Sequence, residues 1–279
     1  MARTVWYPGH MAKGLRQLKD LLQKLDVIVE VRDARAPEAT ASPFSKQAEK
    51  VKPLWIVLSK RDLADEKVTR RWVRFYRDQG KTAWAFDLRS TQLKPLLSEV
   101  GKEKPSHRDL RLAVIGIPNV GKSMFLNLVI GKKAASVGAV PGVTKGVSWY
   151  RGRGFLVVDS PGIVDPKSDA AVHRLLAWLA GSRSDVIGGY ESVALDFITY
   201  AQERRLWEKT LGSWDIAGPG LPPADVLVNV GKRLGCLVKG GRVDLERAGK
   251  MLLDSFATGK LGRVSLETPE TAAFQDVKR

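Results

Sequence analysis

Apolar residues follow two patterns in the first part of this chain. Short apolar runs rich in Val, Ile and Leu are typical of strands buried on both faces of a parallel sheet. Such runs cover residues 26–31, 53–58, 82–86, 112–115 and 155–158. Apolar residues at helical spacing predict helices over residues 12–25, 44–50, 66–79 and 124–130. Strands that alternate with helices predict a three-layer αβα fold around a mostly parallel sheet.

Beyond residue 168 the pattern changes to helices. They are predicted over residues 169–180, 190–211, 224–234 and 244–258. A Gly- and Pro-rich stretch at residues 216–223 interrupts them, and a further strand is expected only at residues 263–266. This change predicts a small all-α domain after the α/β domain.

The expected domain boundary lies at residue 170. The α/β domain then covers residues 1–170 and begins with an N-terminal segment and helix over residues 1–25. Residues 101–108 are polar and rich in residues that interrupt helices, which is typical of a linker between two halves of a domain. The helical domain covers residues 171–279 and has no catalytic motif of its own.

The segment from Gly116 to Ser123 has the pattern Gly-x-x-x-x-Gly-Lys-Ser of a phosphate-binding loop. A chance match is the alternative, and the predicted strand before it and helix after it argue against chance. In such a loop, backbone N–H groups and the N-terminal end of the next helix face the phosphates. Lys122 would reach the β- and γ-phosphates, and Ser123 would bind Mg²⁺. The residues expected to contact nucleotide are Asn119, Val120, Gly121, Lys122, Ser123 and Met124.

A second motif, Ser59-Lys60-Arg61-Asp62, follows the predicted strand at residues 53–58. It is similar to the guanine-specificity motif Asn-Lys-x-Asp. Asp62 would accept hydrogen bonds from N1–H and the 2-amino group of guanine, a pair of donors that adenine lacks. The aliphatic stem of Lys60 would cover the base. Asparagine also braces the phosphate loop in this motif. Serine at position 59 would therefore weaken nucleotide binding unless it takes over this contact. The alternative is a charged turn after a strand.

The base would also contact a loop after the third predicted strand. Asp87-Leu88-Arg89-Ser90 follows residues 82–86 and occupies the place of the loop whose backbone N–H recognises O6 of guanine. Asp87 and Leu88 are therefore candidate nucleotide contacts.

Two segments match parts of nucleotide hydrolases that sense the γ-phosphate. Residues 131–145 are small, glycine-rich and without periodicity, as in a loop that orders around the γ-phosphate, with Thr144 as a Mg²⁺ ligand. The apolar run at residues 155–158 leads into Asp159-Ser160-Pro161-Gly162. Asp159 would hold Mg²⁺ directly or through water, and the N–H group of Gly162 would contact the γ-phosphate.

Positive charge is concentrated on the α/β half of the chain. The formal net charge is +16. Residues 1–171 hold 31 Lys and Arg against 17 Asp and Glu, a net charge of +14, whereas residues 172–279 hold 15 against 13, a net charge of +2. A basic surface beside a phosphate site indicates a polyanionic partner, and RNA is the first candidate. The alternative is that the positive charge serves only to keep the protein soluble. In the predicted helix at residues 66–79, Arg70, Arg74 and Arg77 share one face that contacts either solvent or an RNA backbone.

Cysteine content and hydropathy indicate the compartment. A single cysteine, Cys236, excludes a disulfide framework and a Cys-rich zinc module, and we expect it to be a small buried apolar residue. The N-terminus has no secretory or transit pattern, the C-terminus has no prenylation cysteine, and no apolar run approaches the ~20 residues that cross a bilayer. We therefore expect a cytoplasmic protein without membrane contact that is monomeric when free.

The order of the motifs is unusual. In ordinary GTPases the phosphate loop comes first and the guanine motif last, whereas here residues 59–62 precede residues 116–123. The chain thereby resembles the circularly permuted GTPases that assemble ribosomes, specifically the bacterial ribosome biogenesis GTPase A family and its mitochondrial relatives. The resemblance covers nearly the whole chain and also rests on Trp6-Tyr7-Pro8-Gly9-His10-Met11-Ala12-Lys13, Asp33-Ala34-Arg35 and residues 244–262. The single Cys236 separates it from permuted GTPases that carry zinc-binding cysteine clusters.

This resemblance implies a P-loop GTPase fold in circularly permuted order. It also implies GTP as substrate, with Mg²⁺, and binding to the large ribosomal subunit or its precursor late in assembly. The helical domain at residues 171–279 would contact ribosomal RNA.

The resemblance also supplies a candidate catalytic residue. Many GTPases orient the attacking water with a glutamine directly after Asp-x-x-Gly, but this chain has Ile163 there, so hydrolysis by the free protein should be slow. His10 matches the N-terminal histidine thought to fill this role in the family, and an imidazole with an ordinary pKa of ~6.5 is suited to hold or polarise water. The alternative is that His10 anchors the N-terminal turn. Asn119 resembles the asparagine that helps to bind K⁺ in potassium-stimulated GTPases.

Other classes of function remain open at this point. A GTP-gated switch with negligible turnover, read by RNA or a protein, would use the same motifs. An ATPase that remodels RNA is a more distant alternative.

Overall fold

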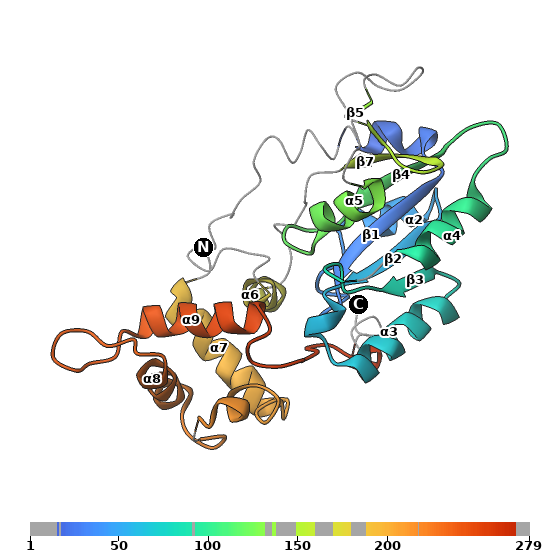
Figure 1. Ribbon diagram of the computed structural model, residues 1–279. Helices are drawn as coiled ribbons and strands as arrows, with labels where there is room; N and C mark the ends of the chain where they lie inside the picture. The colour runs from blue at the N-terminus through green and yellow to red at the C-terminus, as the bar shows by residue number, and fades with distance from the viewer. Residues whose placement is uncertain are drawn as a thin grey trace. The chain divides into compact units, whose positions relative to one another are not determined.

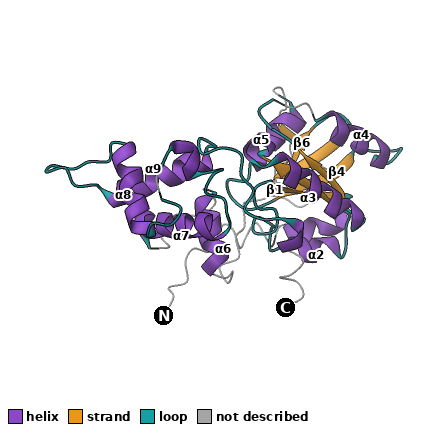
Figure 2. Cartoon of the chain, turned by 90° about the horizontal axis from the view of Figure 1, so that it is seen from below, coloured by secondary structure: helices purple, strands orange, loops and turns teal. Residues whose placement is uncertain are grey.

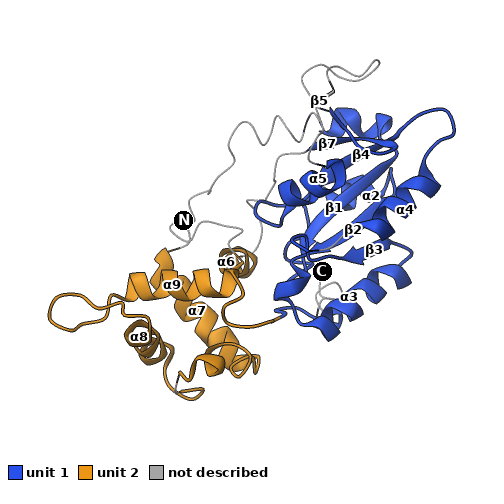
Figure 3. Ribbon diagram, in the orientation of Figure 1, with its two compact units in different colours: residues 1–166, 265–279 blue, residues 167–264 orange. Residues whose placement is uncertain are grey.

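The computed structural model of the chain describes residues 16, 18–90, 93–131, 136–137, 149–159, 170–179, 188–216 and 218–271. The chain forms two compact units (Figure 3). Unit 1 comprises residues 1–166 and 265–279, and unit 2 comprises residues 167–264.

The described part of unit 1 is built on a seven-stranded sheet (Figure 1). Its strands are β1 (Val27–Asp33), β2 (Leu54–Ser59), β3 (Thr82–Ala85), β4 (Leu110–Ile115), β5 (Ser136–Val137), β6 (Trp149–Arg151) and β7 (Phe155–Asp159). They lie in the order β3-β2-β1-β4-β7-β6-β5. The first five in this order are parallel to one another, whereas β6 and β5 pair antiparallel with their neighbours. The expected mostly parallel sheet is confirmed.

Helices cover both faces of this sheet (Figure 2). The chain passes from β1 through α2 (Ser45–Glu49) to β2 and through α3 (Glu66–Asp78) to β3. It then crosses back to β4 through α4 (Lys94–Glu103), and α5 (Lys122–Ile130) follows β4. The chain moves in one direction from β1 to β2 and β3 and in the other direction to β4 and β7, so the direction of strand succession reverses between β1 and β4. Right-handed crossovers that run in opposite directions place their helices on opposite faces. Helices α2 and α3 therefore lie on one face, and α4 and α5 on the other.

The core on the α3 face is aromatic and aliphatic. Trp72 and Tyr76 of α3 are fully buried, their ring centroids lie 5.5 Å apart, and they pack with Ile56 and Leu58 of β2. A second cluster on this face joins the N-terminal helical residues to the sheet and contains Leu18, Leu21, Leu22, Leu25, Ile28, Phe44, Ala113, Ile115 and Trp149. Except for Trp149, which lies in the unexpected strand β6, these positions are apolar members of the predicted strands and helices, so burial follows the sequence pattern.

Several element boundaries differ from expectation. The predicted linker at residues 101–108 begins inside α4, a helix that the sequence pattern missed. Only Leu96 and Val100 of α4 are buried, so its amphipathic pattern is short. Strands β5 and β6 were not expected either, because two or three residues are too few to establish a strand period. In the expected helix at residues 12–25, residues 18–21 are helical and end in the 3₁₀ turn η1 (Leu22–Lys24).

The described part of unit 2 is a helical bundle. Its helices are α6 (Ala170–Trp178), α7 (Gly189–Glu203), α8 (Pro223–Arg233) and α9 (Leu245–Ala257). Trp178, Phe197 and Phe256 form an aromatic core, with centroid separations of 5.6 and 4.8 Å. Gly249 of α9 is required by close helix packing, because a Cβ there would lie 2.5 Å from the carbonyl oxygen of Tyr190. Cys236 is buried, as expected.

Two predictions for this helical part were wrong. The helix expected over residues 190–211 ends at Glu203, where the next turn takes Arg205 to a φ of 55°, and a 3₁₀ turn follows at Leu211–Trp214. The strand expected at residues 263–266 is an irregular segment.

The chain returns to unit 1 after residue 264, which differs from the expected assignment of residues 171–279 to one helical domain. Backbone hydrogen bonds explain the return. The N–H group of Leu266 donates to the carbonyl oxygen of Arg35 at 2.7 Å, and Nε1 of Trp72 donates to the carbonyl oxygen of Glu267 at 3.2 Å. This docking depends on partners far away in the sequence, so local periodicity could not predict it.

The side chain of Glu267 completes the docking. Its carboxylate accepts hydrogen bonds from the N–H groups of Glu38 at 2.8 Å and Ala39 at 3.1 Å. Burial raises the pKa of Glu267 to about 7, and the negative charge of Glu38 acts in the same direction. The folded protein therefore binds an extra proton at this site between about pH 4.5 and 7, so its contribution to the free energy of unfolding falls as pH rises through that window.

We expect Glu267→Gln to remove this pH dependence, because an amide cannot ionise but its oxygen still accepts hydrogen bonds. Calorimetric unfolding of the full chain between pH 5 and 8 should show the parent losing stability relative to the variant as pH rises. Glu246 also accepts two backbone hydrogen bonds, from Tyr190 and Glu191, but it is exposed. Glu246→Gln is the matched control and should not reproduce the effect. A constant difference between parent and Glu267→Gln across the range would contradict the assignment.

Candidate functional site

The carboxyl ends of the parallel strands meet at one edge of the sheet. The residues that follow β2, β3 and β4 are the base motif, the loop at Asp87 and the phosphate loop, and β7 ends at Asp159. In open α/β sheets, ligands bind outside these ends where the direction of strand succession reverses. That point lies between β1 and β4. The fold therefore gathers motifs that the chain order separates.

Two glycines shape the phosphate loop. A Cβ on Gly116 would lie 2.5 Å from the carbonyl oxygen of Val31 in β1, so only glycine lets the loop leave β4 so close to its neighbour. Gly121 has a φ of 99° and is the N-cap of α5. A Cβ there would lie 3.3 Å from Leu88. The loop that follows β3 therefore packs directly against the phosphate loop.

The remaining residues of the loop present polar groups. Asn119 has a φ of 61° and is exposed, and Ser123 and Met124 are exposed in the first turn of α5. The Lys122 side chain is partly buried. Burial lowers the pKa of its ammonium group, and the nearby carboxylate of Asp159 opposes this shift. An ammonium group that is partly removed from solvent is well placed to attract an anion.

Ser59 ties the base motif to the phosphate loop. Its side chain is fully buried, and Oγ lies 2.9 Å from the carbonyl oxygen of Arg32 and 2.5 Å from that of Val120. The hydroxyl has a single hydrogen, so it donates to one carbonyl at a time. Arg32 belongs to β1 and Val120 to the phosphate loop, so Ser59 contacts the backbone of both. The loop-bracing contact expected of asparagine at this position is thus present with serine.

Lys60 is held by Asp33 of the Asp33-Ala34-Arg35 segment. Its Nζ lies 3.0 Å from Oδ2 of Asp33, and its backbone has a left-handed φ of 53°. Asp33 also accepts hydrogen bonds from Nε and Nη2 of Arg35, at 3.0 and 2.8 Å. Asp33 and Arg35 are both buried. Burial alone would raise the pKa of Asp33, but the charges of Arg35 and Lys60 hold it well below its ordinary value.

Asp33 and Arg35 support the base motif, a role that no sequence motif assigned to them. In the sequence they were only part of the family resemblance, whereas in the structure Asp33 contacts Lys60 and Arg35 contacts Asp33. The sequence contained a signal for this role, because Arg32, Asp33 and Arg35 are charged residues at the end of an otherwise apolar strand and need mutual partners if they are buried.

The carboxylate of Asp62, which was predicted to contact the base, has a partner as well. Oδ2 of Asp62 lies 3.2 Å from Nη2 of Arg89, and the Asp62 side chain is 22% exposed. Arg89 follows Asp87, whose carboxylate accepts hydrogen bonds from Oγ of Ser90 and from the N–H group of Arg89. The hydrogen bond from Ser90 is the main reason that the pKa of Asp87 lies below its ordinary value. Asp87 therefore shapes its own turn. Arg89 was not among the expected site residues.

The remaining expected site residues are Arg61, His10, Thr144 and Gly162. Arg61 forms an exposed ion pair with Glu66 at 3.3 Å, and its backbone N–H donates to the carbonyl oxygen of Phe86 at 3.3 Å. His10, Thr144 and Gly162 lie outside the described residues.

The donor set suits magnesium better than a transition metal. Within the described residues no group of three or more His, Cys, Asp or Glu side chains is arranged to hold a metal ion. Ser123 and Asp159 offer oxygen atoms, and β4 and β7 are neighbours with Val114 beside Asp159. Mg²⁺ prefers oxygen and is usually held by one or two protein ligands together with phosphates and water. These two residues fit that arrangement.

Among the described helices, none combines the length and the apolar character that crossing a bilayer requires.

Comparisons with known proteins agree with this site. Residues 111–204 match the model of the family described as 50S ribosome-binding GTPase. Ribosome biogenesis GTPase A of Thermotoga maritima is 37% identical over 275 residues, which are 95% of this chain and 94% of the relative. Mitochondrial ribosome-associated GTPase 1 of Bos taurus is 31% identical over 94% of this chain and 88% of the relative.

Solved structures give the same assignment. The GDP-bound structure of TM YlqF matches with a TM-score of 0.69 and 31% identity over 91% of this chain and all of that chain. The GNP-bound structure of YlqF from T. maritima matches with the same TM-score over 92% of this chain. With the phosphate loop, the base motif and Asp159 at one sheet edge, and with relatives matched over nearly their whole length, the chain belongs to the ribosome biogenesis GTPase A family.

Proposed function

We propose that this protein hydrolyses GTP during late assembly of the large ribosomal subunit, and that the ribosomal particle stimulates hydrolysis. The observation that carries the proposal is the meeting of the phosphate loop and the base motif at the reversal point of the sheet. The names of the relatives, which describe ribosome biogenesis and ribosome association, support the assembly role. The net charge of +14 on residues 1–171 supports ribosomal RNA as a partner.

Nucleotide binding would use the two loops in different ways. Backbone N–H groups from Asn119 to Met124 and the start of α5 would bind the phosphates. Lys122 would contact the β- and γ-phosphates, while Ser123 and Asp159 would hold Mg²⁺, which neutralises the charge that develops on the phosphates. The contacts proposed for the γ-phosphate and Mg²⁺ also include Gly162 and Thr144.

Base recognition would depend on Asp62. Its carboxylate would accept two hydrogen bonds from guanine, Lys60 would cover the base, and the loop at Asp87 and Leu88 would donate to O6. The ion pair between Asp62 and Arg89 supports this, since it orients the carboxylate while both oxygens keep lone pairs that can accept hydrogen bonds.

Hydrolysis would need a group beyond this site. Ile163 cannot orient water, so we propose that His10 orients the attacking water. Asn119, exposed in the phosphate loop, would help to bind K⁺ beside the phosphates. A positive ion there would supply charge that other GTPases obtain from an arginine.

Ser59→Ala should weaken GTP and GDP binding equally, because the lost hydrogen bond braces Val120 and does not depend on the γ-phosphate. One hydrogen bond contributes about 1 kcal/mol, which corresponds to about a fivefold rise in both Kd values measured by fluorescent nucleotide titration. Ser213→Ala is the matched control, since Ser213 Oγ also donates to a backbone carbonyl, that of Thr210 at 2.6 Å. Loss of GTP affinity alone would contradict the bracing role.

Asp62→Asn should shift the base preference from guanine toward xanthine. The amide offers a donor where the carboxylate accepted, and xanthine has a carbonyl oxygen where guanine has its 2-amino group. Competition between GTP, XTP and ATP measures the shift. ATP binding by the parent as tight as GTP binding would show that the base assignment is wrong.

Large ribosomal subunits should accelerate GTP hydrolysis by the parent, whereas small subunits should not. His10→Ala should lower the stimulated rate by ~10²–10⁴-fold, the usual contribution of a positioned acid–base group. Its nucleotide affinity should hardly change, because a group that acts in the transition state changes kcat. Lys122→Ala is the comparison variant and should weaken binding itself.

The same experiment separates the alternatives. Equal rates with large subunits, small subunits or neither would favour a GTP-gated switch. A His10→Ala protein that matches the parent on the large subunit would refute the role of His10 alone.

A further inference from the structure

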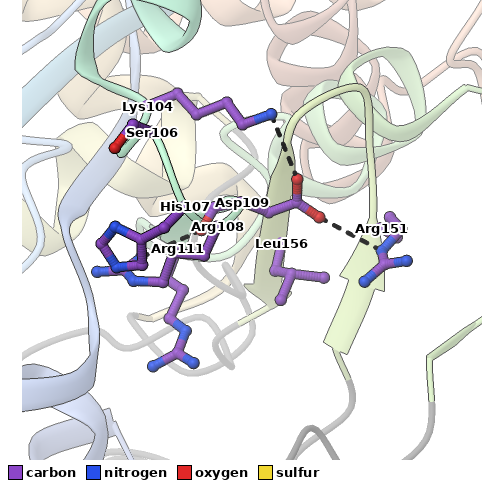
Figure 4. Close-up of a pocket in the computed structure, with 8 residues that line it drawn as sticks. All are labelled: Lys104, Ser106, His107, Arg108, Asp109, Arg111, Arg151 and Leu156. Carbon is purple, nitrogen blue, oxygen red and sulfur yellow. Dashed lines mark hydrogen bonds and ion pairs between the residues drawn. The ribbon is translucent and has the colours of Figure 1, made fainter.

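A second positively charged site lies at the opposite end of the same strands. A hollow of about 440 Å³ opens beside the first residues of β4 and β7 (Figure 4). We call it the basic hollow and define it by Lys104, His107, Arg108, Asp109, Arg111 and Arg151. The six residues of β4 separate it from the phosphate loop by roughly 20 Å. The nucleotide in the main site cannot fill it.

Asp109 organises two of the cations around the hollow. Its carboxylate lies 3.7 Å from Nζ of Lys104 and 3.5 Å from Nε of Arg151 (Figure 4). The Lys104 side chain is 39% exposed and that of Arg151 is 62% exposed. One carboxylate therefore positions two cations without neutralising both, and each keeps hydrogen-bond donors that face solvent.

Arg108 has a different role. Its guanidinium forms two hydrogen bonds with Asp26, at 2.6 and 2.8 Å, so its charge is compensated and it fixes the wall of the hollow. The same carboxylate accepts from the backbone N–H of Arg111 at 2.8 Å. In the described part of the chain, the guanidinium of Arg111 has no carboxylate partner. The lining thus keeps an excess of positive charge on Lys104, Arg111 and Arg151.

The shape and chemistry favour a polymer with phosphate groups. Small-molecule sites are enclosed and mostly apolar, whereas this hollow is open and its lining is mainly polar. Guanidinium groups match the geometry of phosphate oxygens, and lysine adds a flexible point charge. Arg153, in the turn between β6 and β7, is exposed and adds another cation beside Arg151.

We propose that the basic hollow binds the phosphodiester backbone of RNA through Lys104, Arg111 and Arg151, as a contact separate from the nucleotide site. This inference rests on the proposed function, because the RNA is that of the ribosomal particle. It assigns part of the RNA contact to one end of the sheet in unit 1.

The test removes the three charges together. Lys104→Gln/Arg111→Gln/Arg151→Gln should lower affinity for a double-helical RNA hairpin by at least about tenfold at 0.1 M salt. The slope of log affinity against log salt should become shallower by about two to three, since each phosphate contact contributes about 0.7–0.9. GDP affinity should be unchanged, which shows that the variant is folded.

A matched control changes the same charge elsewhere on unit 1. Lys46→Gln/Lys50→Gln/Lys94→Gln removes three exposed cations of α2, its C-terminal end and α4, none of which is a candidate RNA or nucleotide contact. If this control lowers the affinity and the slope as much as the hollow variant does, the effect is one of net charge and the proposal is overturned. Inorganic phosphate that binds the parent as tightly as RNA, and loses affinity in the hollow variant, would assign the site to a small anion and also overturn it.

GTP hydrolysis by the parent protein and RNA binding by the hollow variant together distinguish a failure of this inference from a failure of the proposed function. If large subunits stimulate parent hydrolysis but the hollow variant keeps the RNA affinity and salt slope of the parent, only the inference fails. If large subunits do not stimulate the parent but the hollow variant loses RNA affinity, only the proposed function fails.

Discussion

The buried carboxylate of Asp33 is the constraint on which the nucleotide edge depends. It ends the central strand β1 and must find positive partners, because an isolated buried charge is costly. Arg35 and Lys60 supply them, at 2.8 and 3.0 Å. Arg35 lies in the turn after β1, and the contact with Lys60 fixes the side chain that would cover the base. The backbone N–H of Ala34 also donates to the carbonyl oxygen of Ser59, so the ends of β1 and β2 are joined by backbone as well as by charge.

The same turn connects the base motif to the end of the chain. The carbonyl oxygen of Arg35 accepts the N–H of Leu266, and Glu267 caps the N–H groups of Glu38 and Ala39 a few residues further on. A segment that follows unit 2 in sequence is thereby part of the structure that holds Lys60. This arrangement gives a physical reason why unit 1 includes residues from both ends of the chain, and why a division of the sequence into consecutive domains could not describe it.

The sequence was sufficient for features that depend on local patterns. Five apolar runs predicted the parallel strands, and the glycines and lysine of the phosphate loop predicted its conformation, since Gly116 and Gly121 adopt geometries that side chains disfavour. It was insufficient where partners are distant. Arg89 reaches Asp62 only because β3 lies next to β2, and the docking of residues 265–271 depends on Trp72, about 190 residues earlier. Helix α4 was missed for another reason: two buried residues in ten give little periodicity.

Serine at position 59 keeps one of the two contacts that asparagine makes in this motif. Asparagine at this position combines a contact to the base with a contact to the phosphate loop, and a serine is too short to serve both. The buried hydroxyl between the carbonyl oxygens of Arg32 and Val120 keeps the second contact. Val120 precedes Gly121, whose backbone lies close to both Ser59 and Leu88. The three loops at the nucleotide edge therefore meet at Gly121, beside the small side chain of Ser59. A bulkier residue there would have to displace the phosphate loop itself, so the position is constrained by packing as much as by base recognition.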